Sequence, residues 1–223
     1  MATVGRMATV TEAHVLTLAQ WFSPAYPVGG FAYSHGLEAA IASGRIDTAA
    51  ALKDWVFTVL ESGSGRNDAL FLAAAYQATT PEEITQIDDQ CRAFASSFER
   101  AKETTLLGQA FAKVSNAVWD SGLDSLSFPV AVGVAASRSG LPLRLTTQMF
   151  LQAFVSNLAS VGMRLIPLGQ TEGQRLIRDA ASICAQVAAE TETGDLELLS
   201  ASAFVADIDA MSHETQYSRI FRT

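Results

Sequence analysis

Charged side chains are scarce in this sequence, and basic ones are scarcer than acidic ones. Only 17% of the 223 residues are charged, and 15 lysines and arginines against 23 acids give a net charge of −8. Without a basic stripe to neutralise phosphates, we expect no binding to nucleic acid and no docking on an anionic membrane. A hydrophobic fraction of 49% and a mean hydropathy of +0.20 are high for a soluble monomer. We therefore expect a partner or a second copy to cover some apolar surface.

Cysteine and long apolar runs are also nearly missing. Cys91 and Cys184 form no CxxC pair, which predicts two small buried hydrophobes in a reducing compartment. The longest uncharged stretch, residues 145–163, carries too many hydroxyl and amide side chains for a membrane span. The sequence begins without a basic region followed by a long apolar run, so we expect no signal peptide. Because MATV occurs at residues 1–4 and again at 7–10, we expect residues 1–10 to be a disordered extension.

The usual catalytic signatures are missing as well. The sequence contains no GxxxxGK[ST] phosphate loop, no GxGxxG, no HExxH and no GxSxG. Ser34, His35 and Glu38 could serve as nucleophile, base and orienting acid, but their spacing favours a helix cap and a solvated helical face. Neither His213 with Glu214 nor the cysteines have a spacing that gathers three metal ligands. We predict a non-enzyme with no catalytic residues, no metal ligands and no tightly bound cofactor.

What the sequence does contain is helical periodicity with weak strand signals. It predicts an all-α, single bundle-like domain of roughly eight to ten helices over residues 11–211, followed by a tail at 212–223. Thr11, Asp47 and Asn67 are candidate helix starts, and Thr80-Pro81 is a strong one. A long helical stretch should follow, broken or bent around Gly108. Further helices are expected over 129–140, 145–166, 171–190 and 203–211.

One loop differs from an ordinary linker: residues 23–38 read SPAYPVGGFAYSHGLE. Pro24 and Pro27 restrict the backbone, whereas Gly29 and Gly30 permit positive φ and close approach. Aromatic residues lie between and after them, and Ser34 can cap a following helix. The combination predicts a shaped corner between two helices that packs against the domain or receives a partner.

Three separated segments carry a family resemblance. Residues 18–46 (LAQWFSPAYPVGGFAYSHGLEAAIASGRI), 157–177 (NLASVGMRLIPLGQTEGQRLI) and 213–223 (HETQYSRIFRT) closely resemble, in the same order, the UreF family of urease accessory proteins. Weaker similarity surrounds residues 99–109 and 128–136. Tyr26 and Ala32 depart from the residues most frequent in the family, but the prolines and glycines of the loop are kept.

The resemblance implies a function. Members of this family are cytoplasmic, all-α, non-catalytic and generally dimeric, and they assemble with UreD (UreH in some organisms) and the GTPase UreG. That complex inserts nickel into apo-urease in a GTP-dependent way, with nickel handled by the complex and GTP bound by the partner. The alternative left open is a metallochaperone that carries nickel on His35, His213 or a cysteine. A small helical hydrolase is a further alternative.

The resembling segments also nominate partner-binding residues. Arg164, Gln170 and Gln174 surround a helix corner and offer planar donors suited to a polar interface. The tail alternates apolar and basic residues, which favours ordering on a partner, while folding back on its own domain stays the alternative. The full set is Pro27, Gly29, Gly30, Phe31, Tyr33, Ser34, His35, Glu38, Arg164, Gln170, Gln174, His213, Glu214, Gln216, Tyr217, Arg219, Phe221 and Arg222.

Overall fold

Helices account for the regular structure of residues 9–223, which are the residues that the computed structural model describes, and no strand forms among them. The all-α prediction is confirmed. The expected extension at residues 1–10 falls mainly on residues 1–8, outside the described part. The elements are α1 (Glu12–Trp21), η1 (Gly30–Ala32), α2 (Leu37–Ala42), α3 (Ala49–Ser62), α4 (Ser64–Gln77), α5 (Pro81–Ala93), α6 (Phe98–Trp119), α7 (Phe128–Arg138), α8 (Leu143–Leu165), α9 (Gln170–Glu190), η2 (Leu196–Leu198) and α10 (Phe204–His213).

Four α-helix starts in the described part of the chain are set by side-chain caps, from Thr11, Thr48, Thr80 and Ser97. Thr11 caps α1 as predicted, and Thr80 caps α5 in a capping box with Glu83, followed by Pro81. The prediction of Asp47 as a cap was wrong by one residue, because the Thr48 hydroxyl accepts the backbone N–H of Ala51. Short-range chemistry therefore places these helices to within a residue or two.

The prediction that Asn67 opens a helix was wrong. The fourth helix, α4, begins at Ser64, and Asn67 lies buried inside it. Its side-chain amide donates to the Ser200 carbonyl at 2.7 Å and accepts the Ser200 backbone N–H at 3.3 Å. Asn67 therefore does not cap a helix but binds the backbone of a distant segment, and this contact depends on tertiary packing.

The prediction of a helix broken or bent around Gly108 was also wrong. The chain ends α5 at Ala93 and begins α6 behind the Ser97 cap, and α6 then continues through Gly108. Glycine is needed there because a Cβ would lie 1.9 Å from the Leu126 carbonyl oxygen. The missing side chain marks a close crossing of two backbones, not a break in the helix.

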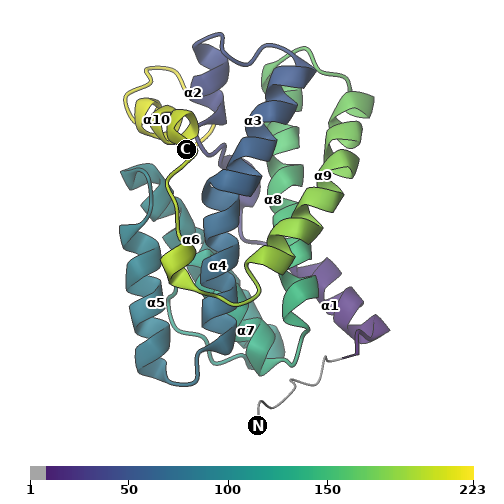
Figure 1. Ribbon diagram of the computed structural model, residues 1–223, viewed down its shortest axis with the longest axis vertical. Coiled ribbons are helices and arrows are strands. Elements are labelled where there is room, and N and C mark those ends of the chain that lie inside the picture. Colours follow the sequence, from purple (N-terminus) through teal and green to yellow (C-terminus); the bar gives the residue numbers. More distant parts are fainter. Residues whose placement is uncertain (1–8) are drawn as a thin grey trace.

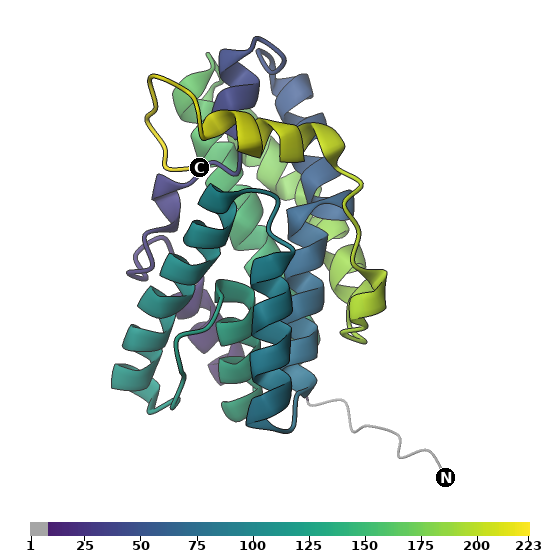
Figure 2. The same ribbon diagram turned by 90° about the vertical axis from the view of Figure 1, so that its left-hand side faces the viewer.

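The helices stand side by side in a bundle, with α1 near one end and the C-terminus nearer the other (Figure 1). The central α4 packs against α7, α8 packs against α9, and α6 covers α7. The last helix, α10, lies across one end of the bundle against α2, and the chain then loops back to end beside it (Figure 2). A Cβ on Gly36 would lie 2.5 Å from the Ala210 backbone nitrogen, so only glycine permits this α2–α10 approach.

Small and apolar side chains fill the interior. Gly162 allows a close helix approach as predicted, and the neighbour is Leu52 of α3 in the same chain. Cys91 and Cys184 are free and buried, which confirms the prediction that both side chains are buried. Across residues 9–223, no helix combines the length and the apolar character that crossing a bilayer would need.

Candidate functional site

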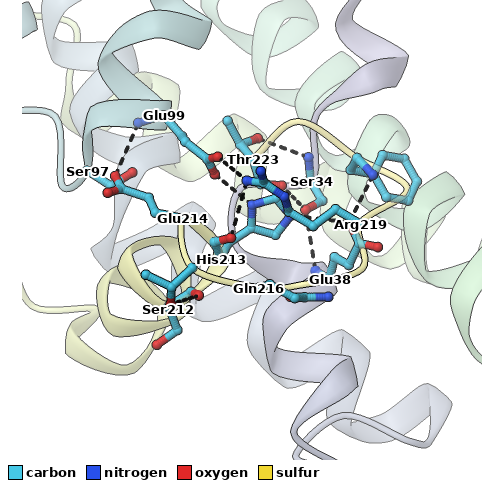
Figure 3. Close-up of polar contacts among 12 residues, drawn as sticks. Ser34, Glu38, Ser97, Glu99, Ser212, His213, Glu214, Gln216, Arg219 and Thr223 are labelled. Atoms are coloured by element: carbon cyan, nitrogen blue, oxygen red, sulfur yellow. Dashed lines mark hydrogen bonds and ion pairs between the residues drawn. The ribbon is translucent and has the colours of Figure 1, made fainter.

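The polar centre of this protein forms where the tail, residues 214–223, returns to the Pro/Gly loop. Arg222 donates its backbone N–H to the Ala32 carbonyl at 2.8 Å, and Ser34 donates its own to a main-chain oxygen of Thr223 at 3.1 Å. The Ser34 hydroxyl also donates to that oxygen. Figure 3 shows the tail crossing over α2, with Ser34, Glu38, His213 and Thr223 pointing toward one another. Residues separated by most of the sequence thus form one site.

Glu38, in the first turn of α2, holds the tail. Its two carboxylate oxygens accept the backbone N–H groups of Ile220 at 2.7 Å and Phe221 at 2.9 Å. The side chain is buried, so an anion here requires these donors. The expectation that Ser34 to Glu38 form a solvated helical face was wrong, because the tail covers them.

His213 links this carboxylate to a second one. Its Nε2 lies 3.2 Å from Glu38 Oε2 and its Nδ1 lies 2.6 Å from Glu99 Oε2, and the ring is fully buried. Arg219 reaches the other Glu99 oxygen at 2.5 Å. An imidazolium donates to both carboxylates at once, whereas a neutral ring donates to only one. His213 therefore joins the Glu38 and Glu99 side chains, and Arg219 adds a cation beside Glu99.

Glu103 forms the centre of a second buried network. One oxygen accepts from His35 Nε2 at 2.8 Å, and the other accepts from Arg100 at 2.5 Å and from the Thr223 hydroxyl at 2.8 Å. Burial acts to raise the pKa of Glu103, but the Arg100 charge and the His35 hydrogen bond outweigh it and lower the pKa to about 2. An ionised Glu103 therefore fastens the end of the tail to the second turn of α6.

His35 has an unusual environment. Its φ of 55° is in the left-handed region, which is uncommon for a residue other than glycine. Burial lowers its pKa, and the charge of Arg100 lowers it further. The ring is thus neutral near pH 7, with Nε2 donating to Glu103. The triad hypothesis fails on geometry. The Ser34 hydroxyl donates to Thr223 and accepts the Glu38 backbone N–H at 3.3 Å, and His35 binds Glu103, so neither side chain pairs with the Glu38 carboxylate.

The rest of the loop presents both exposed and buried groups. Pro27 is exposed and Phe31 is 71% exposed, whereas Tyr33 is buried. Gly29 has a φ of 79° and precedes the single turn of η1 that begins at Gly30. The Tyr33 carbonyl accepts a hydrogen bond from Asn157 of α8. The loop is therefore a packed corner with Phe31 on its surface.

The helix corner contributes one residue to the site. Arg164 places its guanidinium 5.3 Å from the centre of the Phe221 ring. Gln170 and Gln174 are exposed at the start of α9, and within residues 9–223 neither makes a side-chain hydrogen bond to the tail. The structure thus brings Arg164 to the tail and leaves the two glutamines apart from it.

The tail folds back on its own domain, the alternative that the sequence left open. Phe221 and Thr223 are buried, while Tyr217 is fully exposed. Glu214 accepts the backbone N–H groups of Phe98 and Glu99 and so caps α6. The Gln216 side chain donates to the Ser218 carbonyl, within the tail itself, and the Arg222 side chain is exposed. Partner docking by these residues stays a prediction.

Three important residues did not emerge from the sequence reading: Glu99, Arg100 and Glu103. Two acids four residues apart on one helix repel each other unless cations lie between or beside them. That spacing, in a chain with so little charge, was the available signal. Thr223 had no signal, because its role depends on where the tail folds.

The nickel-carrier hypothesis finds no ligand set in the described part of the chain. Over residues 9–223, no group of three or more His, Cys, Asp or Glu side chains is arranged to hold a metal ion. Both ring nitrogens of His213 contact carboxylates, and His35 Nε2 contacts Glu103, so these nitrogens already have partners within the protein. Burial raises the pKa of the Cys184 thiol to about 12 and raises that of Cys91 as well, so neither is a ready thiolate ligand.

Fold and site together define an all-helical protein whose tail is bound by buried carboxylates at one end of the bundle. A model of the UreF family matches residues 46–181. The chain is 51% identical to the urease accessory protein UreF of Ruegeria pomeroyi, over 97% of this chain and 100% of that one. It is 50% identical to UreF of Roseobacter denitrificans (98% and 97%) and 44% identical to UreF of Bradyrhizobium diazoefficiens (98% and 96%). The chain belongs to the UreF family of urease accessory proteins.

Proposed function

We propose that this protein is a non-catalytic adaptor in urease maturation. It joins a UreD/UreH-type protein and a UreG-type GTPase in a complex that inserts nickel into apo-urease, and it modulates the GTPase. Nickel is handled by the complex and GTP is bound by the GTPase, so this chain needs no tightly bound cofactor of its own. It acts in the cytoplasm, as a homodimer. Family membership supports the pathway, and one surface supports the adaptor role.

That surface is the outer face of α10. Phe204, Val205, Ile208 and Met211 are each more than half exposed and recur at helical spacing. The opposite face is buried against the domain through Asp209, Ala210 and His213. A helix that packs one face on its own domain and leaves an apolar face in water is typical of a protein–protein contact.

The tail exposes further apolar side chains. Tyr217 is fully exposed and Ile220 is 66% exposed, although their neighbour Phe221 is buried. The backbone of Ile220 is held by Glu38. The tail therefore presents an ordered aromatic and an aliphatic side chain, at a lower entropic cost than a free segment would incur on binding.

Co-purification with homologous UreD, UreG and apo-urease tests the proposal. Ile208→Asp with Met211→Asp should keep the helical circular dichroism spectrum and abolish retention of at least one partner. Val118→Asp is the matched control, since Val118 is a similarly exposed apolar residue on α6. Failure of the unaltered protein to retain any partner, in every order of mixing and with GTP present, would overturn the adaptor role. Equal retention by the α10 variant would exclude this surface.

A further inference from the structure

A pocket of about 420 Å³ lies behind the Pro/Gly loop, between that loop, α6 and α8. Much of its wall is aromatic: Trp21, Phe22, Phe31, Phe128, Phe150 and Phe154. A volume in this range is typical of small-molecule sites, and an inorganic ion would leave most of it unfilled. The walls therefore suit an apolar ligand body.

The polar part of the lining has one carboxylate in excess. Arg100 and Glu103 pair at 2.5 Å, and His35 is neutral and bound to Glu103. Asp68 also lines the pocket, yet its nearest cation is Arg100 at 3.9 Å. No hydrogen bond satisfies the Asp68 side chain within residues 9–223, and 18% of it is exposed. A carboxylate in this position lacks both full hydration and a close partner.

The other pocket residues add no competing charge. The lining contributed by α8 is uncharged, including Met149, Gln152 and Asn157, and so is that from α1. Besides Asp68, the titratable groups in the lining are Arg100, Glu103, His35 and Tyr26, and the Asp68 charge also acts on the buried Cys91 thiol of α5. Burial raises the pKa of Asp68 to about 7, with Arg100 opposing this and Glu103 adding to it. A cation placed at Asp68 would remove this penalty.

We infer that this pocket binds a small organic cation, a primary ammonium group on an aromatic or similarly apolar body. The ammonium donates to the Asp68 carboxylate, and the body lies against the aromatic wall, where ring faces also attract the positive charge. A bare metal ion fits less well, because the described residues assemble no group of three acidic, histidine or cysteine ligands. The inference stands on the pocket and does not depend on the proposed adaptor function.

The test compares three probes of one shape: 2-phenylethylammonium, neutral 2-phenylethanol and anionic phenylacetate. Titrations of the full chain by protein NMR at pH 8 should give the cation a dissociation constant about tenfold or more below that of the alcohol, with the acid weakest. Asp68→Asn should reduce the affinity for the cation to that for the alcohol. Asp89 is an exposed acid on α5, and Asp89→Asn should leave all three affinities unchanged. Equal affinities for cation and alcohol in the unaltered protein would overturn the inference.

The pH profile tests the same site in the unaltered protein and needs no variant to fold. Asp68 loses its proton between about pH 6 and 8, while the probe stays protonated. The affinity of the cation should therefore rise across this interval, and that of the alcohol should not. A flat profile for the cation, or unchanged cation binding in Asp68→Asn, contradicts the assignment of the ammonium to Asp68.

Discussion

His213 Nε2 lies 3.2 Å from the Glu38 carboxylate, so a residue at the end of α10 contacts the first turn of α2. The same carboxylate holds the backbone of Ile220 and Phe221. The last helix, the tail and the Pro/Gly loop are thus joined through one buried anion. We expect them to open and close as a unit.

Glu38→Gln should loosen this unit. Glutamine keeps one carbonyl oxygen, but its NH₂ group would face a backbone N–H that now has an acceptor. We expect a loss of about 2 kcal/mol in unfolding free energy, and trypsin cleavage at Arg219 and Arg222 faster by about tenfold. Glu61→Gln, an exposed acid on α3, is the control. Unchanged cleavage would show that Glu38 does not hold the tail.

Tyr217 and Phe221 separate docking from folding. Tyr217→Ala removes a fully exposed ring and should leave the unfolding free energy within about 0.5 kcal/mol, while weakening partner retention. Phe221→Ala removes a buried ring and should cost about 3 kcal/mol. Urea unfolding and co-purification measure the two effects. A stable Tyr217→Ala variant with full retention would remove Tyr217 from the partner surface.

Gly108→Ala tests the close crossing of α6 with the segment before α7. Alanine favours a helix by about 1 kcal/mol over glycine, yet its Cβ would lie 1.9 Å from the Leu126 carbonyl oxygen. We expect a net loss of about 2 kcal/mol in urea unfolding. Gly30→Ala is the control, since a Cβ there has no neighbour within 4 Å. A stabilised Gly108→Ala would mean that the two segments move apart at little cost.

Asp68→Asn should change how stability depends on pH. The folded pKa of about 7 is above the unfolded value of 3.8, so folding binds a proton and stability falls as pH rises between them. The neutral amide escapes this loss. At pH 8 the variant should therefore unfold with a free energy on the order of 2–4 kcal/mol higher than the parent, and at pH 4 with a similar one. Chemical denaturation at both pH values measures this. The same difference in unfolding free energy between variant and parent at pH 4 and at pH 8 would contradict the prediction.

Much of the helical architecture could be predicted from local sequence. Thr11, Thr80 and Pro129 mark helix starts because caps and proline act on neighbouring backbone groups. The predictions at Asn67 and Gly108 were wrong, because asparagine is a common helix start and glycine a common helix interruption. Their actual partners, Ser200 and Leu126, are brought near only by packing.

The candidate site divides in the same way. The sequence alone indicated the shaped loop, the tail, the family and the all-α class, because composition, periodicity and motifs are local or additive properties. Only the tertiary structure decided that Glu38 and Ser34 are buried under the tail and that the Glu103 carboxylate accepts a hydrogen bond from Thr223. A buried carboxylate is stable only with donors around it, and those donors come from opposite ends of the chain. The contact between these donors and the carboxylates therefore depends on the whole fold, and no single segment specifies it.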